Sequence, residues 1–178
     1  LRLTKNLAKE HKIKNLCLAG GVALNCVANG KILKQNLFEN IWIQPASGDA
    51  GGSLGAALAY WYRELDKPRE KFKDRMKGSY LGPKFELGEI EKKLKSLSAI
   101  YEKKETNEVS SIIAKELSKN KTVGWFQGRM EFGPRALGCR SILADPRSEK
   151  MQKELNIKIK FRESFRPFAP SILREDLN

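Results

Sequence analysis

The sequence predicts an α/β protein, and three features of its pattern support this. Residues 16–19 (LCLA) form a short apolar run that ends at two glycines. Residues 41–43 (IWI) form a second run, which ends shortly before Pro45. A helix-like segment follows each run, and strands that alternate with helices are the pattern of α/β domains. We therefore expect two strand–helix pairs in the first part of the chain.

The spacing of apolar residues predicts the two helices. The first runs from about Leu24 to Gln35, although Gly30 weakens it. The second begins at Asp49, which is placed as its N-cap. The apolar face of the second helix consists of Leu54, Leu58, Trp61 and Leu65.

A domain boundary is predicted in the charged, proline-containing stretch 66–84. The expected organisation is a domain over 1–70, a linker over 71–84 and a second domain over 85–178. In the second domain we expect helices over 87–97, 108–117 and 149–159, a buried strand over 122–127, and a strand in RPFAPSIL between Pro167 and Pro170.

The composition favours an anionic partner. The 178 residues include 34 Lys+Arg against 21 Asp+Glu, a formal net charge of +13. No apolar run approaches the ~18 residues of a membrane helix, and the opening LRLTKNLAKE lacks the pattern of a signal peptide. We expect a cytoplasmic protein with no membrane partner. Because the sequence opens on Leu1 and not methionine, we also expect it to be part of a longer polypeptide.

The segment WFQGRMEFGPRALGCRSI (125–142) is the strongest chemical signal. Arg129, Arg135 and Arg140 share neither a helical face nor a strand face, and a glycine recurs every five residues between them. This pattern predicts a bent loop that holds an anion, because guanidinium groups bind phosphate or carboxylate in a bidentate manner. Arg162 and Arg166 would join this loop if the last strand folds back beside it. The alternative is that some of these arginines pair with nearby acids and only brace the loop. Those acids are Glu131, Asp145 and Glu163.

Two further loops follow the predicted strands, at the ends where α/β sheets bind ligands. In AGGVALN, Gly20 and Gly21 let a phosphate or sugar approach the backbone, and Asn25 offers a donor and an acceptor. A plain strand–turn–helix junction explains the glycines equally well. In SGDAGG, Asp49 is either a helix cap or an oxygen ligand of a divalent metal. His11 lies in a lysine-rich stretch and is expected to be solvated.

Four blocks of the sequence, in this order, resemble the ATP-dependent O-carbamoyltransferases of antibiotic and nodulation-factor biosynthesis. The blocks are LAGGVALN, IWIQPASGDAGGSLGAAL, GWFQGRMEFGPRALGCRSIL and FRPFAP. The resemblance spans nearly the whole chain. It implies the C-terminal part of an actin/hexokinase-like ATP-binding domain, followed by a partial YrdC-like α/β domain.

The resemblance also implies a reaction. Carbamoyl phosphate and ATP would form a carbamoyl-adenylate in the YrdC-like domain, and the carbamoyl group would pass to a hydroxylated small-molecule acceptor, a sugar or other natural product. The cofactors implied are ATP with Mg²⁺, and a divalent metal, Fe²⁺. The implied sites are Arg129, Arg135, Arg140, Ser141 and Arg166 for carbamoyl phosphate and nucleotide phosphates, Gly20, Gly21 and Asn25 for the nucleotide, and Asp49 for the metal.

One departure from the family pattern matters. The family's paired metal-binding histidines and the rest of its ATP domain are missing from these residues, so we expect the missing N-terminal part of the same polypeptide to be a partner, and residues 1–178 alone to be inactive in carbamoyl transfer.

The competing hypothesis is a basic nucleic-acid-binding module, suggested by the charge and by Trp125 and Phe126 close to Arg129. It is disfavoured because TVGWFQ is predicted to be a buried strand and no RNA-binding motif is present, so no nucleic-acid partner is expected. A threonylcarbamoyl-type tRNA modification protein shares the domain types but is not expected to carry GRMEFGPRALG.

Overall fold

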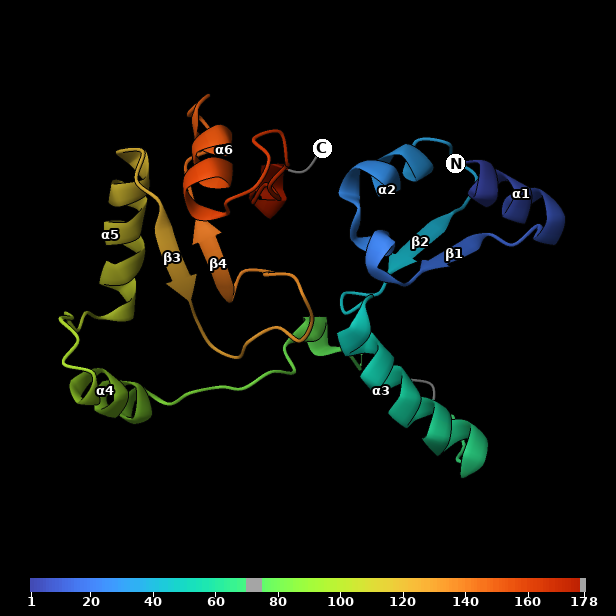
Figure 1. Ribbon diagram of the computed structural model, residues 1–178, viewed down its shortest axis with the longest axis horizontal. Coiled ribbons are helices and arrows are strands. Elements are labelled where there is room, and N and C mark those ends of the chain that lie inside the picture. The colour runs from blue at the N-terminus through green and yellow to red at the C-terminus, as the bar shows by residue number, and fades with distance from the viewer. Residues whose placement is uncertain (70–74, 177–178) are drawn as a thin grey trace. The chain divides into compact units, whose positions relative to one another are not determined.

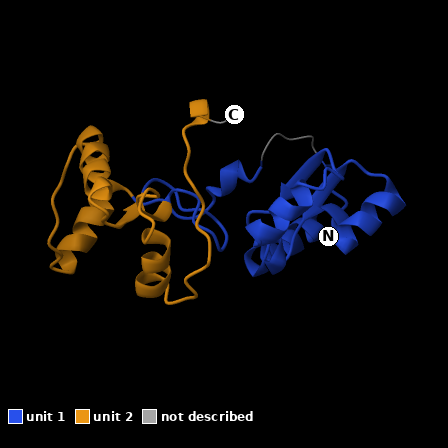
Figure 2. Cartoon of the chain, turned by 90° about the horizontal axis from the view of Figure 1, so that it is seen from above, with its two compact units in different colours: residues 1–85, 127–139 blue, residues 86–126, 140–178 orange. Residues whose placement is uncertain are grey.

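A computed structural model describes residues 1–69 and 75–176, which have a mixed α/β fold. The chain divides into two compact units (Figure 2). Unit 1 consists of Leu1–Phe85 together with Gln127–Cys139, and unit 2 consists of Glu86–Phe126 together with Arg140–Asn178. The predicted boundaries at 70 and 85 stay a prediction, and residues 71–74 of the predicted linker lie outside the described residues.

Unit 1 contains a two-stranded parallel sheet (Figure 1). Leu16 of the first strand pairs with Ile41 of the second. Parallel neighbours need a crossover connection, which one of the helices supplies. The elements in order are α1 (Arg2–His11), β1 (Asn15–Leu18), a 3₁₀ turn (Gly21–Leu24), α2 (Cys26–Leu33), β2 (Asn40–Ile43) and α3 (Asp49–Ala59), which continues into a π turn (Tyr60–Glu64).

These elements confirm the two predicted strand–helix pairs, with one correction at a helix start. Gly48 is the N-cap of α3, and Asp49 is its first residue and makes no capping hydrogen bond from its side chain. The predicted N-cap role of Asp49 was therefore wrong. A carboxylate in the first turn still interacts favourably with the helix dipole, which explains why the sequence resembles a capped start.

The core of unit 1 is small. Its buried apolar side chains are Leu16, Ala23, Ile32 and Ala46. By contrast α3 has no buried residue, and Leu58, Trp61 and Leu65 of its predicted apolar face are 41%, 49% and 40% exposed. The helix was predicted correctly, but the described residues do not cover its apolar face.

Unit 2 is built from two capped helices and a hairpin-like pair of strands. Both helices begin with a capping box, Glu86 with Glu89 and Glu105 with Glu108, which satisfies backbone donors of the first turn. Met151 and Leu155 are its buried apolar side chains. The elements are α4 (Leu87–Ser96), α5 (Thr106–Ser118), β3 (Val123–Phe126), β4 (Arg140–Leu143) and α6 (Met151–Glu154), which continues into a π turn (Leu155–Ile159); α5 lies alongside β3 in Figure 1.

The helices of unit 2 were predicted, but its strands were not fully predicted. The antiparallel partner β4 was missed, because RSIL directly follows the glycine-rich loop. The strand β3 is present but is not buried, since Phe126 is 50% exposed. The strand predicted in RPFAPSIL is absent, since Pro167 and Pro170 have no N–H to donate to a ladder.

The side chain of Asn156, in the π turn after α6, holds the residues that lead into the segment predicted as a strand. The fully buried amide of Asn156 donates to the carbonyls of Ser164 (3.1 Å) and Arg166 (2.8 Å). Arg162 Nε donates to Asn156 Oδ1 at 2.6 Å. These bonds hold residues 162–166 on an irregular path, and of these residues only Arg166 belongs to RPFAPSIL.

In residues 1–69 and 75–176, no helix is both long enough and apolar enough to cross a bilayer. All three cysteines are free thiols; Cys17 and Cys26 are exposed, and Cys139 is half-buried.

Candidate functional site

Two turns lie together at one edge of the sheet in unit 1. They are the glycine turn, which contains Gly20 and Gly21, and the PASG turn, residues 45–48. Because β1 and β2 are parallel, their carboxyl ends meet at the same edge. The N–H of Gly20 donates to the carbonyl of Ser47 at 2.6 Å, and the N–H of Gln44 donates to the carbonyl of Leu18 at 3.1 Å. Two of the three predicted ligand-binding segments are therefore joined by backbone hydrogen bonds.

The glycine turn leaves open space beside its backbone. A Cβ added at Gly20 or at Gly21 would have no neighbouring atom within 4 Å, and Gly20 has φ +93°. A ligand can therefore approach this backbone without displacing a side chain. The space fits the nucleotide-binding role implied for the turn, although it does not identify the ligand.

Asn25, the third residue predicted for the nucleotide, caps a helix. Its Oδ1 accepts the N–H of Ala28 at 3.0 Å, which makes it the N-cap of α2. Nearby, Asn29 Nδ2 donates to the carbonyl of Ala23 at 2.7 Å and fixes the 3₁₀ turn against the helix. The cap occupies one acceptor position of the amide and leaves the Nδ2 donors of Asn25 available for other contacts.

The loop between β3 and β4 packs against the PASG turn. A Cβ at Gly133 would lie 3.1 Å from Cα of Ala46 and 3.2 Å from the carbonyl oxygen of Pro45. Ala46 is fully buried by these contacts and by α3. All three predicted ligand-binding segments of unit 1 thus meet at residues 45–48, although they are far apart in the sequence.

The prediction of a bent loop is confirmed. Gly128, Gly133 and Gly138 have φ values of +60°, +122° and +112°, in a region that side chains with a Cβ rarely adopt. The glycines at five-residue intervals therefore mark the positions where the backbone turns. We call residues 127–139 the arginine loop.

A second set of backbone bonds fixes the arginine loop along residues 79–83. The N–H of Phe132 donates to the carbonyl of Ser79 at 2.7 Å, and the N–H of Gly82 donates to the carbonyl of Met130 at 3.0 Å. Arg129 Nη1 donates to the carbonyl of Gly82 at 2.6 Å. Arg129 therefore serves partly to hold the loop, while its guanidinium remains exposed and has further N–H groups.

Sequence reasoning named Glu131 as an acid that braces the loop through an arginine, but it missed the bonds of Glu131 to the loop amides. Its side chain is buried, at 4% exposure, and Oε1 accepts the N–H groups of Leu137 and Cys139, each at 2.7 Å. Burial, and secondarily the charge of Glu131, raises the pKa of the Cys139 thiol. The available signal was an acidic residue flanked by Met130 and Phe132, which places a carboxylate in an apolar setting.

Arg140 and Ser141 belong to unit 2, where they begin β4. Arg140 pairs with Phe126 and Ser141 with Trp125 in the antiparallel register. Successive side chains of a strand point to opposite faces, so Arg140 and Ser141 lie on different faces of the ribbon. One bound anion cannot easily contact both side chains from the same face.

Arg166 also belongs to unit 2, and it is paired with an acid. Its Nε donates to Glu163 Oε2 at 2.8 Å, and the pKa of Glu163 is lowered by its own backbone N–H and by Arg166. The bracing alternative therefore holds for Arg166. Arg162 is engaged as well, over the ring of Phe168 at 4.9 Å. Of the residues predicted for phosphate, unit 1 carries Arg129 and Arg135, while unit 2 carries Arg140, Ser141 and Arg166.

The metal ligand implied for this chain is Asp49, which is exposed at the start of α3. Within the part of the chain that the structure describes, no group of three His, Cys, Asp or Glu side chains is arranged to hold a metal ion. His11 lies 3.9 Å from Glu10 and is solvated, as expected. Asp49 alone does not make an iron site.

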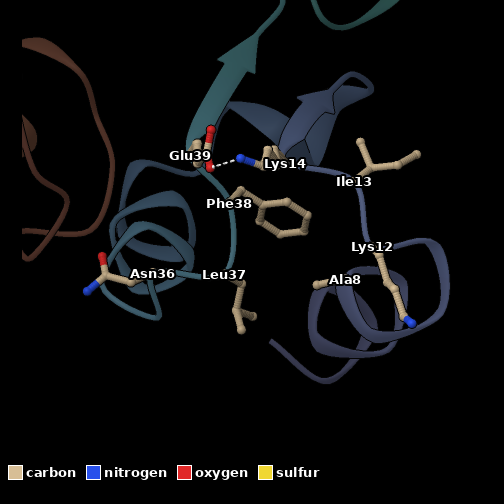
Figure 3. A pocket seen from close by; sticks show the side chains of 8 residues that line it. All are labelled: Ala8, Lys12, Ile13, Lys14, Asn36, Leu37, Phe38 and Glu39. Carbon is tan, nitrogen blue, oxygen red and sulfur yellow. Dashed lines mark ion pairs between the residues drawn. The ribbon is translucent and has the colours of Figure 1, made fainter.

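A pocket of about 400 Å³ lies at the opposite edge of the same sheet, at the amino ends of β1 and β2 (Figure 3). Lys14 and Glu39 form an ion pair of 2.6 Å across its rim, as the dashed line in Figure 3 indicates. None of the predicted site residues lines it, so it does not support the predicted site. Its lining residues are Ala8, Lys12, Ile13, Lys14, Asn36, Leu37, Phe38 and Glu39.

Comparison with known proteins gives matches at both ends of the chain. Residues 1–58 match the family model described as "Carbamoyltransferase N-terminus", and residues 114–178 match "Carbamoyltransferase C-terminus". The chain is 56% identical over 98% of its length to an uncharacterized protein of Synechocystis sp., of which it covers 29%. It is 47% identical to nodulation protein NolO of Bradyrhizobium diazoefficiens, over 98% of this chain and 32% of that protein.

A further relative is nodulation protein NolNO of Sinorhizobium fredii, 47% identical over 99% of this chain and 26% of that protein. The chain thus spans less than a third of the length of each of these relatives. The two family models match in the order in which their names place them. Together with the motif segments that meet at residues 45–48, these matches identify the chain as a member of the carbamoyltransferase family.

Proposed function

We propose that this chain is part of an ATP-dependent enzyme that carbamoylates a hydroxyl group of a small molecule. The meeting of the glycine turn, the PASG turn and the arginine loop at residues 45–48 carries the proposal. Family membership supports carbamoyl transfer, and the open space beside Gly20 and Gly21 is suited to a nucleotide. The excess of 34 Lys+Arg over 21 Asp+Glu favours the anionic reactants.

The proposed reaction has two steps whose atoms balance. Carbamoyl phosphate, ATP and one water give the carbamoyl-adenylate, phosphate and pyrophosphate. The acceptor hydroxyl then attacks the carbamoyl carbon, the bond from that carbon to the AMP oxygen breaks, and the hydroxyl proton is lost to solvent or a base. The products are the carbamoylated acceptor and AMP. The adenylate is useful because AMP is a good leaving group, and cationic side chains stabilise the charge on the phosphates.

In this proposal the arginine loop binds phosphate groups. Arg129 and Arg135 are both exposed on a backbone that is fixed at residues 79–83 and at Ala46. Arg140, Ser141 and Arg166 of unit 2 are proposed to contribute to carbamoyl phosphate and nucleotide binding in the complete enzyme. For Arg166 this requires exchange of the exposed Glu163 carboxylate for a phosphate, a low-cost change for a surface ion pair.

Mg²⁺ is proposed to enter with ATP, bound mainly by the phosphates. Fe²⁺ would need ligands in addition to Asp49, so no step is assigned to it here. Asp49 is proposed as one ligand of such a site. Its position next to the glycine-rich start of α3 leaves its carboxylate accessible to a cation.

The test uses the full natural polypeptide that contains this chain, with residues 1–178 alone beside it. Pyrophosphate release from ATP is measured with and without carbamoyl phosphate, because this readout requires no knowledge of the acceptor. We expect release only when both are present, and none from residues 1–178 alone. Release that ignores carbamoyl phosphate would contradict the proposal, as would single-stranded oligonucleotide binding with steep salt dependence in place of carbamoyl phosphate binding.

A further inference from the structure

The buried carboxylate of Glu131 lies at the centre of the arginine loop. It is 4% exposed, and its Oε1 accepts two backbone N–H groups at 2.7 Å each, from Leu137 and Cys139. A buried carboxylate is unfavourable unless donors meet its charge, and charge-assisted bonds of this length are among the stronger ones in proteins. The carboxylate is therefore bound to the loop itself and is not directed to solvent.

The two N–H groups place Arg135 inside a closed bend. Glu131 precedes Arg135 by four residues, and Leu137 and Cys139 follow it by two and four. The carboxylate thus ties the two arms of the bend together on either side of the exposed Arg135. The first arm is also fixed from outside, because the N–H of Phe132 donates to the carbonyl of Ser79 at 2.7 Å.

A cation on a fixed backbone binds an anion with less loss of conformational freedom than one on a mobile loop. The loop has glycines of positive φ at 128, 133 and 138, and such a backbone has many alternative conformations when nothing restrains it. Leu137 and Cys139 lie on either side of Gly138, so the carboxylate restrains the backbone at one of these glycines.

We propose that Glu131 is a positioning residue, which holds Arg135 ready for the phosphate of the carbamoyl donor. This inference rests on the proposed function, because it takes the donor phosphate as the ligand of Arg135. Glu131 itself makes no contact with the donor. Its Oε1 is bound to the two loop amides, so its part is to hold the backbone on either side of Arg135.

The test is a double-mutant cycle in the full natural polypeptide that contains this chain. The variants are Glu131→Gln, Arg135→Met and the double variant, and KM for carbamoyl phosphate, KM for ATP and kcat are measured for each. Glu131→Gln keeps the side-chain length but loses the charge. We expect it to raise KM for carbamoyl phosphate by about 10- to 100-fold, the scale of a misplaced binding group, and to leave KM for ATP within about twofold.

The double variant gives the decisive readout. If Glu131 acts through Arg135, Glu131→Gln causes no further rise in KM for carbamoyl phosphate once Arg135 is Met. Additive effects would overturn the proposal, as would a Glu131→Gln variant that melts at a lower temperature but keeps its KM. If Glu131→Gln does not accumulate as folded protein, the same cycle with Glu131→Asp replaces it, because the shorter carboxylate keeps the charge but not the reach.

Two controls separate this inference from the proposed function. Glu39→Gln removes an exposed carboxylate of the same unit, paired with Lys14, and is expected to leave both KM values unchanged. If Arg135→Met raises KM for carbamoyl phosphate and Glu131→Gln does not, the positioning role is wrong and the proposed function stands. If the wild-type protein shows no reaction with carbamoyl phosphate, the proposed function itself is wrong.

Discussion

A Cβ at Gly133 would lie 3.1 Å from Cα of Ala46. The backbone of the arginine loop thus reaches the turn that follows β2 at a distance that only glycine permits. This single approach joins two motif segments that are distant in sequence.

Gly133→Ala should destabilise the protein more than the same change at Gly128. At Gly133 both the positive φ and the contact with Ala46 oppose a side chain, and we expect a cost of about 2–3 kcal/mol in the free energy of unfolding. At Gly128 only φ opposes it, since no atom lies within 4 Å, and the cost should be about 1 kcal/mol. Denaturant unfolding of both variants measures this difference, and equal costs would show that the close approach is not formed in solution.

Arg129→Lys tests whether the guanidinium geometry matters for the donor. Lysine keeps the charge but cannot bond the Gly82 carbonyl and a phosphate in the same planar arrangement. We expect KM for carbamoyl phosphate to rise about tenfold, with stability changed by less than about 1 kcal/mol because the side chain is exposed. Arg174→Lys is the matched control, and an equal effect of both variants on KM would refute the assignment of Arg129.

Asn25 can be tested for two roles with two variants. Asn25→Ala removes the cap of α2 and should cost about 1 kcal/mol of stability. Asn25→Asp keeps a capping acceptor but places a negative charge beside the glycine turn. It should therefore retain stability while weakening ATP binding, measured by calorimetry. Unchanged ATP affinity in a stable Asn25→Asp protein would leave Asn25 with the capping role alone.

Acid stability should depend on the Asp145–Arg147 pair. Side-chain and backbone hydrogen bonds from Arg147 lower the pKa of Asp145 to about 2. The ordinary value is about 3.9, so the folded state is favoured above pH 4, and this stabilisation disappears as the pH falls toward 2. We expect wild-type protein to be more stable than Arg147→Gln at pH 7, with the two becoming equal near pH 2.

Thermal unfolding between pH 2 and pH 7 measures this convergence. Arg174→Gln removes the same charge outside the pair, so its stability difference from wild type should not follow the titration of Asp145. A constant difference between wild type and Arg147→Gln across this range would mean that the pair does not form in solution.

Local pattern was sufficient to predict most of the helices and three of the four strands in the residues that the structure describes. The apolar runs at 16–19 and 41–43 are short, uninterrupted and followed by turn residues. A run of this length favours a strand over a helix. The glycine spacing in 127–139 likewise predicted a bend, because glycine has no Cβ and so adopts positive φ readily.

The remaining errors have physical causes that a local pattern does not contain. RSIL became a strand because it pairs with residues 123–126 across the loop. RPFAPSIL did not, and the carbonyl of its first residue, Arg166, instead accepts from the buried amide of Asn156. The sequence named Glu131 as an acid that braces the loop, but not its two amide donors, because these come within reach only when the loop closes around the carboxylate. The predicted convergence of the arginines stays a prediction, because its members belong to both units.

The chain passes between the two units three times, after residues 85, 126 and 139. No single peptide-bond break can therefore yield two intact modules. A cut between Phe85 and Glu86 would leave the arginine loop covalently attached to the half that does not contain the turn it packs against. Recombination at that point would exchange the loop without the turn that supports it. We therefore expect the two segments to evolve together.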